Sequence, residues 1–431
     1  MKKLLIALAV LLVIVVGSPA VIGSMAESAM QENLGWAAGQ AGTGELDVSA
    51  EEFEKGWFSS TGRYRVEIGD GQLQASMLDA FDASDSDSLP YLIVDTKLDH
   101  GVIPLSTMKP GLGSAESTIS IVAPDGEVFN VPGVIYSDIG FGGGVDSVYE
   151  LDAGSHDFGD AVVEWQDTRV SVGNSLASGQ VVLDASMAGF SVNGDEGNFS
   201  ISGISIVSDQ APSEAGFLVG TADIRIDSLE VSEADKPAMT AGPITVKSTS
   251  SANGELLDAD TQMSMSMSEL PMIGNMLLEM DIAITGLHGG AAESIGEAMS
   301  LVDDNADPGA IYGLIEDDLM TLFENGFVVD FREFDVELDQ GRTDTSIMVT
   351  VPAMEPGFTW PDVLQAMTAE AKLSVPVALM DMVTAMNPQA GAPIAMGFMA
   401  RNGDVYETDA QYAQGLMTIN GAPVPLPIPG N

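Results

Sequence analysis

Apolar and polar residues alternate at every second position through much of residues 61–290, and glycine, serine and asparagine separate the alternating stretches. A strand that buries one face shows this period, because successive side chains point to opposite sides of a sheet. The turn residues between the stretches favour antiparallel neighbours. The clearest predicted strands cover residues 63–68, 161–172, 180–192, 199–208 and 222–231.

Three segments of this region are similar to one another. Residues 201–206, 224–229 and 282–287 each carry alternating aliphatic residues around a serine or glycine. Their spacing along the chain is irregular, which predicts a repeated meander rather than a solenoid of fixed period.

The period changes after residue 290. Asp307 and Pro308 suit the cap and first turn of a helix, and apolar residues then recur at helical spacing until Gly326. A second helical region is predicted at 359–386, interrupted by Pro376.

Further strands are predicted at residues 327–338, 346–351, 404–413 and 416–419. In the first of these, Val329, Phe331 and Glu333 alternate with Val328, Asp330 and Arg332. The predicted fold is α+β and mainly β, with long antiparallel sheets built from meanders and a few amphipathic helices in the C-terminal third.

An uncharged, largely apolar stretch at residues 4–23 follows Lys2 and Lys3. Its length of about 20 residues matches a helix that crosses a bilayer, and the lysines favour a cytoplasmic N-terminus. Small-x-small sequences at 18–20 and 24–26 also fit cleavage of a signal peptide. Under either interpretation we expect the rest of the chain in the periplasm, anchored to a bacterial inner membrane or released from it.

The resulting division of the chain has four parts. Residues 1–26 are the membrane anchor or signal segment, and residues 27–60 are a short, mostly polar helical connector. Residues 61–290 form the β-rich region, and residues 291–431 form an α+β region continuous with the sheet. No segment after the first reaches 18 apolar residues without a charge or a helix breaker, so a multi-span carrier is not expected.

Acidic residues outnumber basic ones by 64 to 15, and the net charge is −49. Nucleic acid and anionic headgroups are therefore poor partners for the surface. Salt shortens the range of self-repulsion, so we hypothesise a moderately halophilic source. The acidic surface is interpreted as solvated, with calcium loading as the alternative. The chain has no cysteine, which excludes thiolate chemistry and disulfides.

Both ends of the body carry a recognisable pattern. Residues 55–66 contain Gly56, Phe58-Ser59-Ser60 and Tyr64, and residues 420–427 read Asn-Gly-Ala-Pro-Val-Pro-Leu-Pro. These resemble the opening signature and the closing hairpin and tail of the YdgA-like family. The resemblance implies a bacterial envelope protein of unknown function with a single N-terminal membrane segment. The acidic, lysine-poor middle of the chain departs from the family, which supplies no catalytic residues to transfer.

Several motifs that could carry chemistry are incomplete. His100, His156 and His288 lie in separate segments, and no Gly-x-Ser-x-Gly elbow is present. The run at 140–144 lacks the Lys-Ser/Thr of a phosphate loop and predicts a bulge or tight turn. The aspartates at 82, 85 and 87 lack the glycine and distal glutamate of a calcium loop. Carboxylate pairs such as 303–304 and 317–318 are too common here to indicate a site.

Methionine is abundant, with 24 in the chain. Met263, Met265 and Met267 alternate with serines, so on a strand their side chains share one face. Six more lie in the last helical region, namely Met367, Met380, Met382, Met386, Met396 and Met399. Ordinary core packing explains such residues, and a Cu(I) site is an alternative that no histidine supports. A soft apolar groove is the third interpretation, because methionine adapts to varied hydrophobic partners.

Three functions remain open at this point. The first is a non-catalytic, membrane-anchored envelope protein that handles hydrophobic clients, either lipid or outer-membrane protein. The second is a structural or interaction scaffold of the envelope, and the third is an enzyme with an unrecognised carboxylate-based site. We assign no catalytic, cofactor-binding or metal-binding residue and no cofactor. The expected partners are the inner membrane and a lipid or envelope-protein client, and nucleic acid is not expected.

Overall fold

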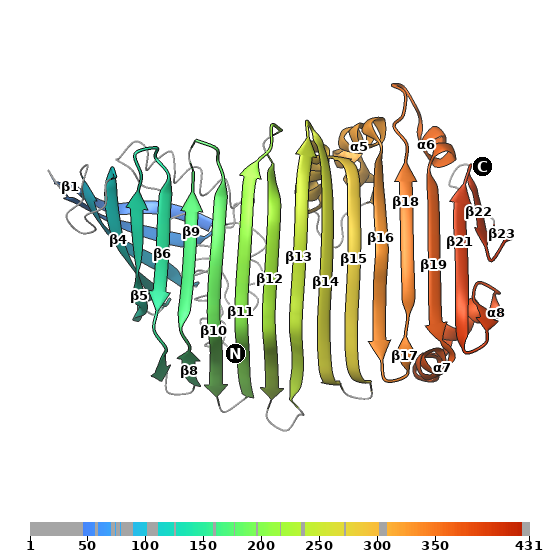
Figure 1. Cartoon of the computed structure of the whole chain (residues 1–431), viewed down its shortest axis with the longest axis horizontal. Helices are drawn as coiled ribbons and strands as arrows, with labels where there is room; N and C mark the ends of the chain where they lie inside the picture. Colours follow the sequence, from blue (N-terminus) through green and yellow to red (C-terminus); the bar gives the residue numbers. More distant parts are fainter. Residues whose placement is uncertain are drawn as a thin grey trace. The chain divides into compact units, whose positions relative to one another are not determined.

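The structure is a computed structural model (Figure 1). It describes residues 46–424 apart from 57–58, 70–73, 75–77, 79–88, 101–110, 125, 158–160, 176, 195–196, 216, 234–237, 271–272 and 301–307. The expected membrane segment, the aspartates at 82, 85 and 87 and the end of the Pro-rich tail lie outside these residues. Within the described ranges, no helix has the length and apolar character needed to cross a bilayer.

The chain divides into two compact units, residues 1–211 with 226–236 and residues 212–225 with 237–431. Strand β12 (Leu218–Glu233) contributes residues to both. The other strands of unit 1 are β1 (Leu46–Lys55), β2 (Ser59–Ile68), β3 (Tyr91–His100), β4 (Gly113–Val122), β5 (Val128–Ile139), β6 (Val145–Leu151), β7 (Gly154–Asp157), β8 (Ala161–Trp165), β9 (Thr168–Asn174), β10 (Val181–Gly194) and β11 (Gly197–Pro212).

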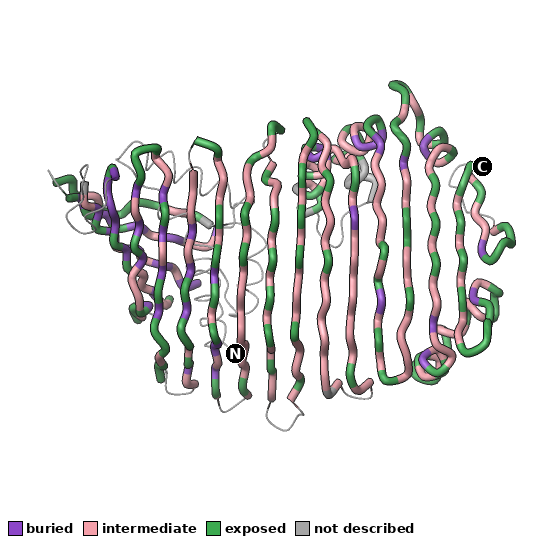
Figure 2. Tube along the Cα trace, viewed as in Figure 1, coloured by how far each residue is buried: buried purple, intermediate pink, exposed green. Residues whose placement is uncertain are grey.

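Unit 1 is an antiparallel meander in which each strand from β1 to β6 pairs with the next. β9 pairs with β6 and β10, β10 pairs with β11, and the β7–β8 hairpin joins through β8 to β10. Buried residues concentrate in this unit (Figure 2). One cluster centres on Ile135, Tyr149 and Val170, and another on Tyr64 and Val94. Unit 1 therefore has a conventional buried core.

Unit 2 contains the remaining strands and all the described helices. Its strands are β13 (Met239–Asn253), β14 (Leu256–Leu270), β15 (Gly274–His288), β16 (Phe327–Leu338), β17 (Gly341–Arg342), β18 (Asp344–Val351), β19 (Thr368–Pro376), β20 (Ala400–Asn402), β21 (Val405–Ala413), β22 (Leu416–Ile419) and β23 (Ala422–Val424). Its helices are α4 (Gly289–Ser300), α5 (Pro308–Asn325), α6 (Trp360–Ala366), α7 (Val377–Met386), the short η2 (Pro388–Gly391) and α8 (Ala392–Ala395).

The strands of unit 2 form an antiparallel sheet in the order β13–β14–β15–β16–β18–β19–β21–β22–β23. Figure 1 shows α5 and α6 near one end of these strands and α7 and α8 near the other. The α+β, mainly β fold class with antiparallel sheet is confirmed, as are the helix that ends at Gly326 and the strands at 327–338 and 416–419.

Several predictions of local structure were wrong. The single strand expected at 161–172 is two strands, β8 and β9. Residues 46–55 of the expected helical connector form β1, which pairs along its length with β2. Residues 368–376 of the expected second helical region form β19 rather than helix. In β19 the apolar residues fall at every second position, from Ala369 to Val375, and both neighbouring strands pair with it. Helix α4 was not predicted.

Candidate hydrophobic client surface

The methionine row predicted from the sequence lies on β14, the second strand in the order given for the unit 2 sheet. Met263, Met265 and Met267 belong to β14, where residues two apart share a face. Their partners on β15 are Met280, Leu278 and Met276, in the same order. Five methionines from two neighbouring strands therefore lie together on one side of the sheet.

A bulge in β16 extends this apolar face. Asp281 of β15 pairs with Glu333, whereas the next residue, Ile282, pairs with Phe331, so Arg332 is an extra residue on β16. The extra residue changes which side chains face the methionines. Phe331 and Phe334 consequently lie on the same face, and Glu333 lies on the other. The sequence prediction that Glu333 shares a face with Phe331 was wrong for this reason.

We call the middle of this face the apolar floor. It consists of Val246, Met263, Met265, Leu278, Met280, Ile282, Phe331, Phe334, Val336 and Ile347. Within the ranges that the structure describes, none of the ten is buried, and Phe334 and Ile347 remain 43% and 38% exposed. Figure 2 shows the central strands of unit 2 mainly in the intermediate and exposed colours.

The size of the floor follows from sheet geometry. Four strand spacings separate β13 from β18, and five residues of β16 separate Phe331 from Val336. At standard spacings the floor measures about 19 Å by 17 Å, on the order of 300 Å². An apolar patch of this size on a monomer is often functional.

Helices cover the same face at both ends of the floor. At one end, Phe323 of α5 and Val363 of α6 pack with Phe327, Val349 and Val351 of the sheet. At the other end, Leu379 of α7 and Ile394 of α8 join a cluster with Leu338, Leu373 and Val375. The floor is therefore bounded by helices at both ends, and we call this bounded apolar face the trough.

Local capping explains where α6 begins. The backbone N–H and the hydroxyl of Thr359 donate to a carboxylate oxygen of Asp362 at 2.8 and 2.7 Å. These two hydrogen bonds lower the pKa of Asp362. The cap fixes the helix start that brings Val363 and Trp360 over the end of the floor.

The opposite face of the same strands is charged. Arg342 of β17 lies among five carboxylates, those of Glu279, Glu333, Asp335, Glu337 and Asp344. Its distances to Glu279 and Asp335 are 2.5 and 2.9 Å. The hydrogen bond to Asp335 is the main cause of the raised pKa of Arg342. Burial, followed by Asp335 and Glu279, raises the pKa of Glu333.

A second arginine on this face has the same role. Arg332, the bulge residue, lies 2.6 Å from Asp260, 3.3 Å from Asp281 and 3.6 Å from Asp330. Both arginines bind carboxylates from neighbouring strands, so they offset part of the acidic repulsion across the sheet. The sheet is therefore amphipathic, with an apolar face and a face of paired charges.

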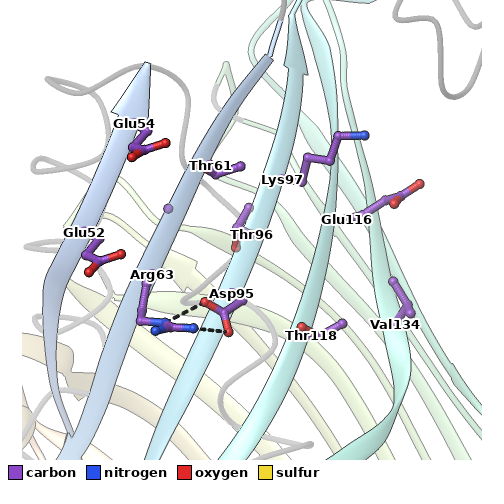
Figure 3. Close-up of a pocket in the computed structure, with 11 residues that line it drawn as sticks. Glu52, Glu54, Thr61, Arg63, Asp95, Thr96, Lys97, Glu116, Thr118 and Val134 are labelled. Atoms are coloured by element: carbon purple, nitrogen blue, oxygen red, sulfur yellow. Dashed lines mark hydrogen bonds and ion pairs between the residues drawn. The ribbon is translucent and has the colours of Figure 1, made fainter. Parts of the chain in front are cut away.

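Unit 1 holds a shallow polar pocket of about 500 Å³ on the outer side of β1 to β5 (Figure 3). Glu52 and Glu54 lie on one side and Lys97 and Glu116 on the other. Between them, Arg63 donates to Asp95 through two hydrogen bonds of 2.7 and 3.0 Å. These hydrogen bonds and the charge of Asp95 raise the pKa of Arg63. The pair satisfies its own charges, and we assign the pocket no ligand.

The three histidines belong to different strands, β3, β7 and β15. His100 ends β3, and the ring of His156 packs edge-on against Phe129 with centroids 5.0 Å apart. The Nδ1 of His288 accepts a hydrogen bond from the backbone N–H of Ala291 at 3.1 Å, at the start of α4. Among the described residues, no group of His, Asp or Glu side chains has an arrangement that could hold a metal.

The glycine run forms a tight turn, as predicted. The N–H of Gly143 donates to the carbonyl of Gly140 at 2.9 Å, and β6 follows directly. Gly143 has a φ of 78°, which favours glycine. The turn joins two strands of a hairpin rather than a strand and a helix, so it is not a phosphate loop.

Fold and surface together define a class of protein: an antiparallel β-sheet protein with one open apolar face, whose ends are covered by helices. The chain belongs to the DUF945 family, described as bacterial proteins of unknown function, and the family model matches residues 1–427. This confirms the resemblance to a YdgA-like family of unknown function. Neither the curated proteins nor the solved structures gave a match.

Proposed function

We propose that this protein is a non-catalytic envelope protein that holds lipid acyl chains on the apolar floor. In this proposal residues 4–23 anchor the chain in the inner membrane, or direct its release, and the body faces the periplasm. The observation that carries the proposal is the floor itself, an apolar sheet face bounded at both ends by helices. Methionine side chains suit a client of variable shape, because they are flexible and polarizable.

The chemistry of the floor favours lipid over an unfolded β-strand. A strand client binds to a sheet mainly through main-chain hydrogen bonds at an edge. The floor is a sheet face, and the backbone groups of β14, β15 and β16 are already paired with neighbouring strands. A hydrocarbon chain needs no hydrogen bonds, so contact with methionine, leucine and phenylalanine is enough to bind it.

The test is native mass spectrometry with lipid extraction on the full chain, purified from an envelope fraction. Phe334→Asp puts a carboxylate on the floor, and Phe141→Asp makes the same change at the β5–β6 turn of unit 1. Both phenylalanines are exposed, at 43% and 57%, so both variants should fold. We expect lipid on the wild type and on the Phe141 variant, and its loss from the Phe334 variant. A folded, lipid-free wild type would refute the proposal and favour a protein client or a scaffold.

A further inference from the structure

Residues 382–400, which we call the α7–α8 corner, contain no charged residue. They include the end of α7, all of η2 and α8, and the loop that leads to β20. In a chain with a net charge of −49, only residues 4–26 and 410–431 form longer uncharged stretches. Val383, Met386 and Met396 are 38%, 56% and 59% exposed there.

The inner side of the corner continues into the trough. Met382, Ile394 and Met399 pack in the cluster that also contains Leu338 and Leu373 of the sheet. Leu338 lies two residues from Val336 of the floor, on the same face of β16. The cluster therefore joins Met382, Ile394 and Met399 of the corner to the sheet, and none of its members is charged.

The helix at the other end of the floor has a different surface. Leu314 of α5 is 67% exposed, but the same helix carries Glu316, Asp317, Asp318 and Glu324. Anionic headgroups repel such a helix more strongly than α7, whose one charged residue, Asp381, immediately precedes the corner. Exposed methionine and valine side chains can also enter the headgroup boundary of a bilayer.

We infer that the α7–α8 corner docks on the surface of a phospholipid bilayer and is the end at which an acyl chain enters the trough. The inference rests on the proposed function. It adds the direction of loading and identifies the residues that touch the membrane. Lack of charge favours this occupant, because headgroups do not repel the uncharged corner, which adjoins the floor, as they repel the acidic surface of the chain.

The absence of cysteine allows a direct test, since one substitution creates a single thiol. The full chain is reconstituted in vesicles of phosphatidylcholine and anionic phosphatidylglycerol, with an environment-sensitive dye at Met386→Cys, Met396→Cys or Leu314→Cys. We expect a blue shift at 386 and 396, with quenching by acyl-brominated phosphatidylcholine, and a water-like emission at 314. Unquenched emission at 386 and 396, or equal quenching at 314, would overturn the inference.

A second measurement separates this inference from the proposed function. Photoactivatable phosphatidylcholine in the same vesicles should crosslink to floor peptides, and Met386→Asp/Met396→Asp should reduce this crosslinking about tenfold. Both positions are exposed, so the variant should unfold at the wild-type temperature and still bind detergent-solubilised lipid. If the wild type crosslinks with neither source of lipid, the proposed function fails. If it crosslinks but the double variant loads equally well, only the inference fails.

Discussion

Leu277 and Leu278 offer a matched pair for testing the floor. They are neighbours on β15, both are half-buried, and they point to opposite faces of the sheet. Leu278 lies between Met265 and Val336, whereas Leu277 lies between Ser266 and Glu337. Leu278→Asn therefore changes the apolar floor, and Leu277→Asn makes the same change on the charged face.

The expected loss of lipid binding can be worked out from burial. Complete burial of a leucine contributes about 1.5–3 kcal/mol, and a lipid would cover only the remaining exposed part, worth about 1 kcal/mol. Asparagine would also place an amide beneath hydrocarbon, which costs at least about 1 kcal/mol more. The sum of about 2 kcal/mol corresponds to about a 30-fold weaker affinity. Without lipid the amide at 278 reaches water, so the two variants should have similar stability.

The assay is titration of the two full-length variants with a fluorescent phospholipid, together with chemical denaturation. We expect a 30-fold loss of affinity for Leu278→Asn and less than a threefold change for Leu277→Asn. Equal affinities would show that lipid does not contact this face. A large loss of stability in Leu278→Asn alone would show that the residue is core and that the floor is not open.

Three further predictions concern stability. Tyr149 is buried, which raises its pKa, and its hydroxyl donates to the carbonyl of Pro132 at 2.6 Å. Tyr149→Phe should therefore lower the free energy of unfolding by about 1–2 kcal/mol in chemical denaturation. An unchanged free energy of unfolding would indicate that water replaces the donor. Burial favours the protonated form of Glu333, so this group stabilises the fold most below its ordinary pKa of 4.5 and less as pH rises through the raised pKa. Between pH 4.5 and neutrality, the melting temperature of Glu333→Gln should therefore fall less than that of the wild type. The same pH profile in both proteins would contradict this reasoning. Arg342→Met leaves Asp335 buried without its partner, which should cost about 3 kcal/mol by urea denaturation, whereas a near-neutral effect would mean that Thr345 alone satisfies the carboxylate.

Alternation in the sequence was sufficient to predict the mainly β fold and strands such as β10, β11, β12 and β16, because period 2 is a local property of half-buried sheet. The same rule describes β19, which was instead predicted as part of a helical region interrupted by Pro376. Pairing with β18 and β21 decides the matter, and such pairing between distant segments is not visible in a local window. Helix α4 was missed because its glycine-rich start, Gly289-Gly290, carries no typical capping residue.

The floor was predictable only in part. The row from Met263 to Met267 is readable from the sequence, since its spacing alone places three thioethers on one face. The contribution of β16 is not, because Phe331 and Phe334 are three residues apart and a regular strand would place them on opposite faces. Only the bulge at Arg332 unites them. The helices at the two ends of the floor likewise depend on tertiary packing, which the methionine count could not locate.

An open apolar face should promote association between copies, and the charge of the chain explains how this can be avoided. Two floors in contact would remove about 600 Å² from water, a gross gain of about 15 kcal/mol, which is comparable to the cost of association. With the two terms nearly balanced, repulsion between chains of net charge −49 decides the outcome. Because the Debye length falls from about 10 Å at 0.1 M salt to about 3 Å at 1 M, lipid-free protein should associate reversibly as salt rises. Sedimentation of residues 27–431 after lipid extraction tests this, with Phe334→Asp as the control that should remain monomeric. Wild-type protein that stays monomeric at 1 M salt would show that charge is not what keeps the apolar faces apart.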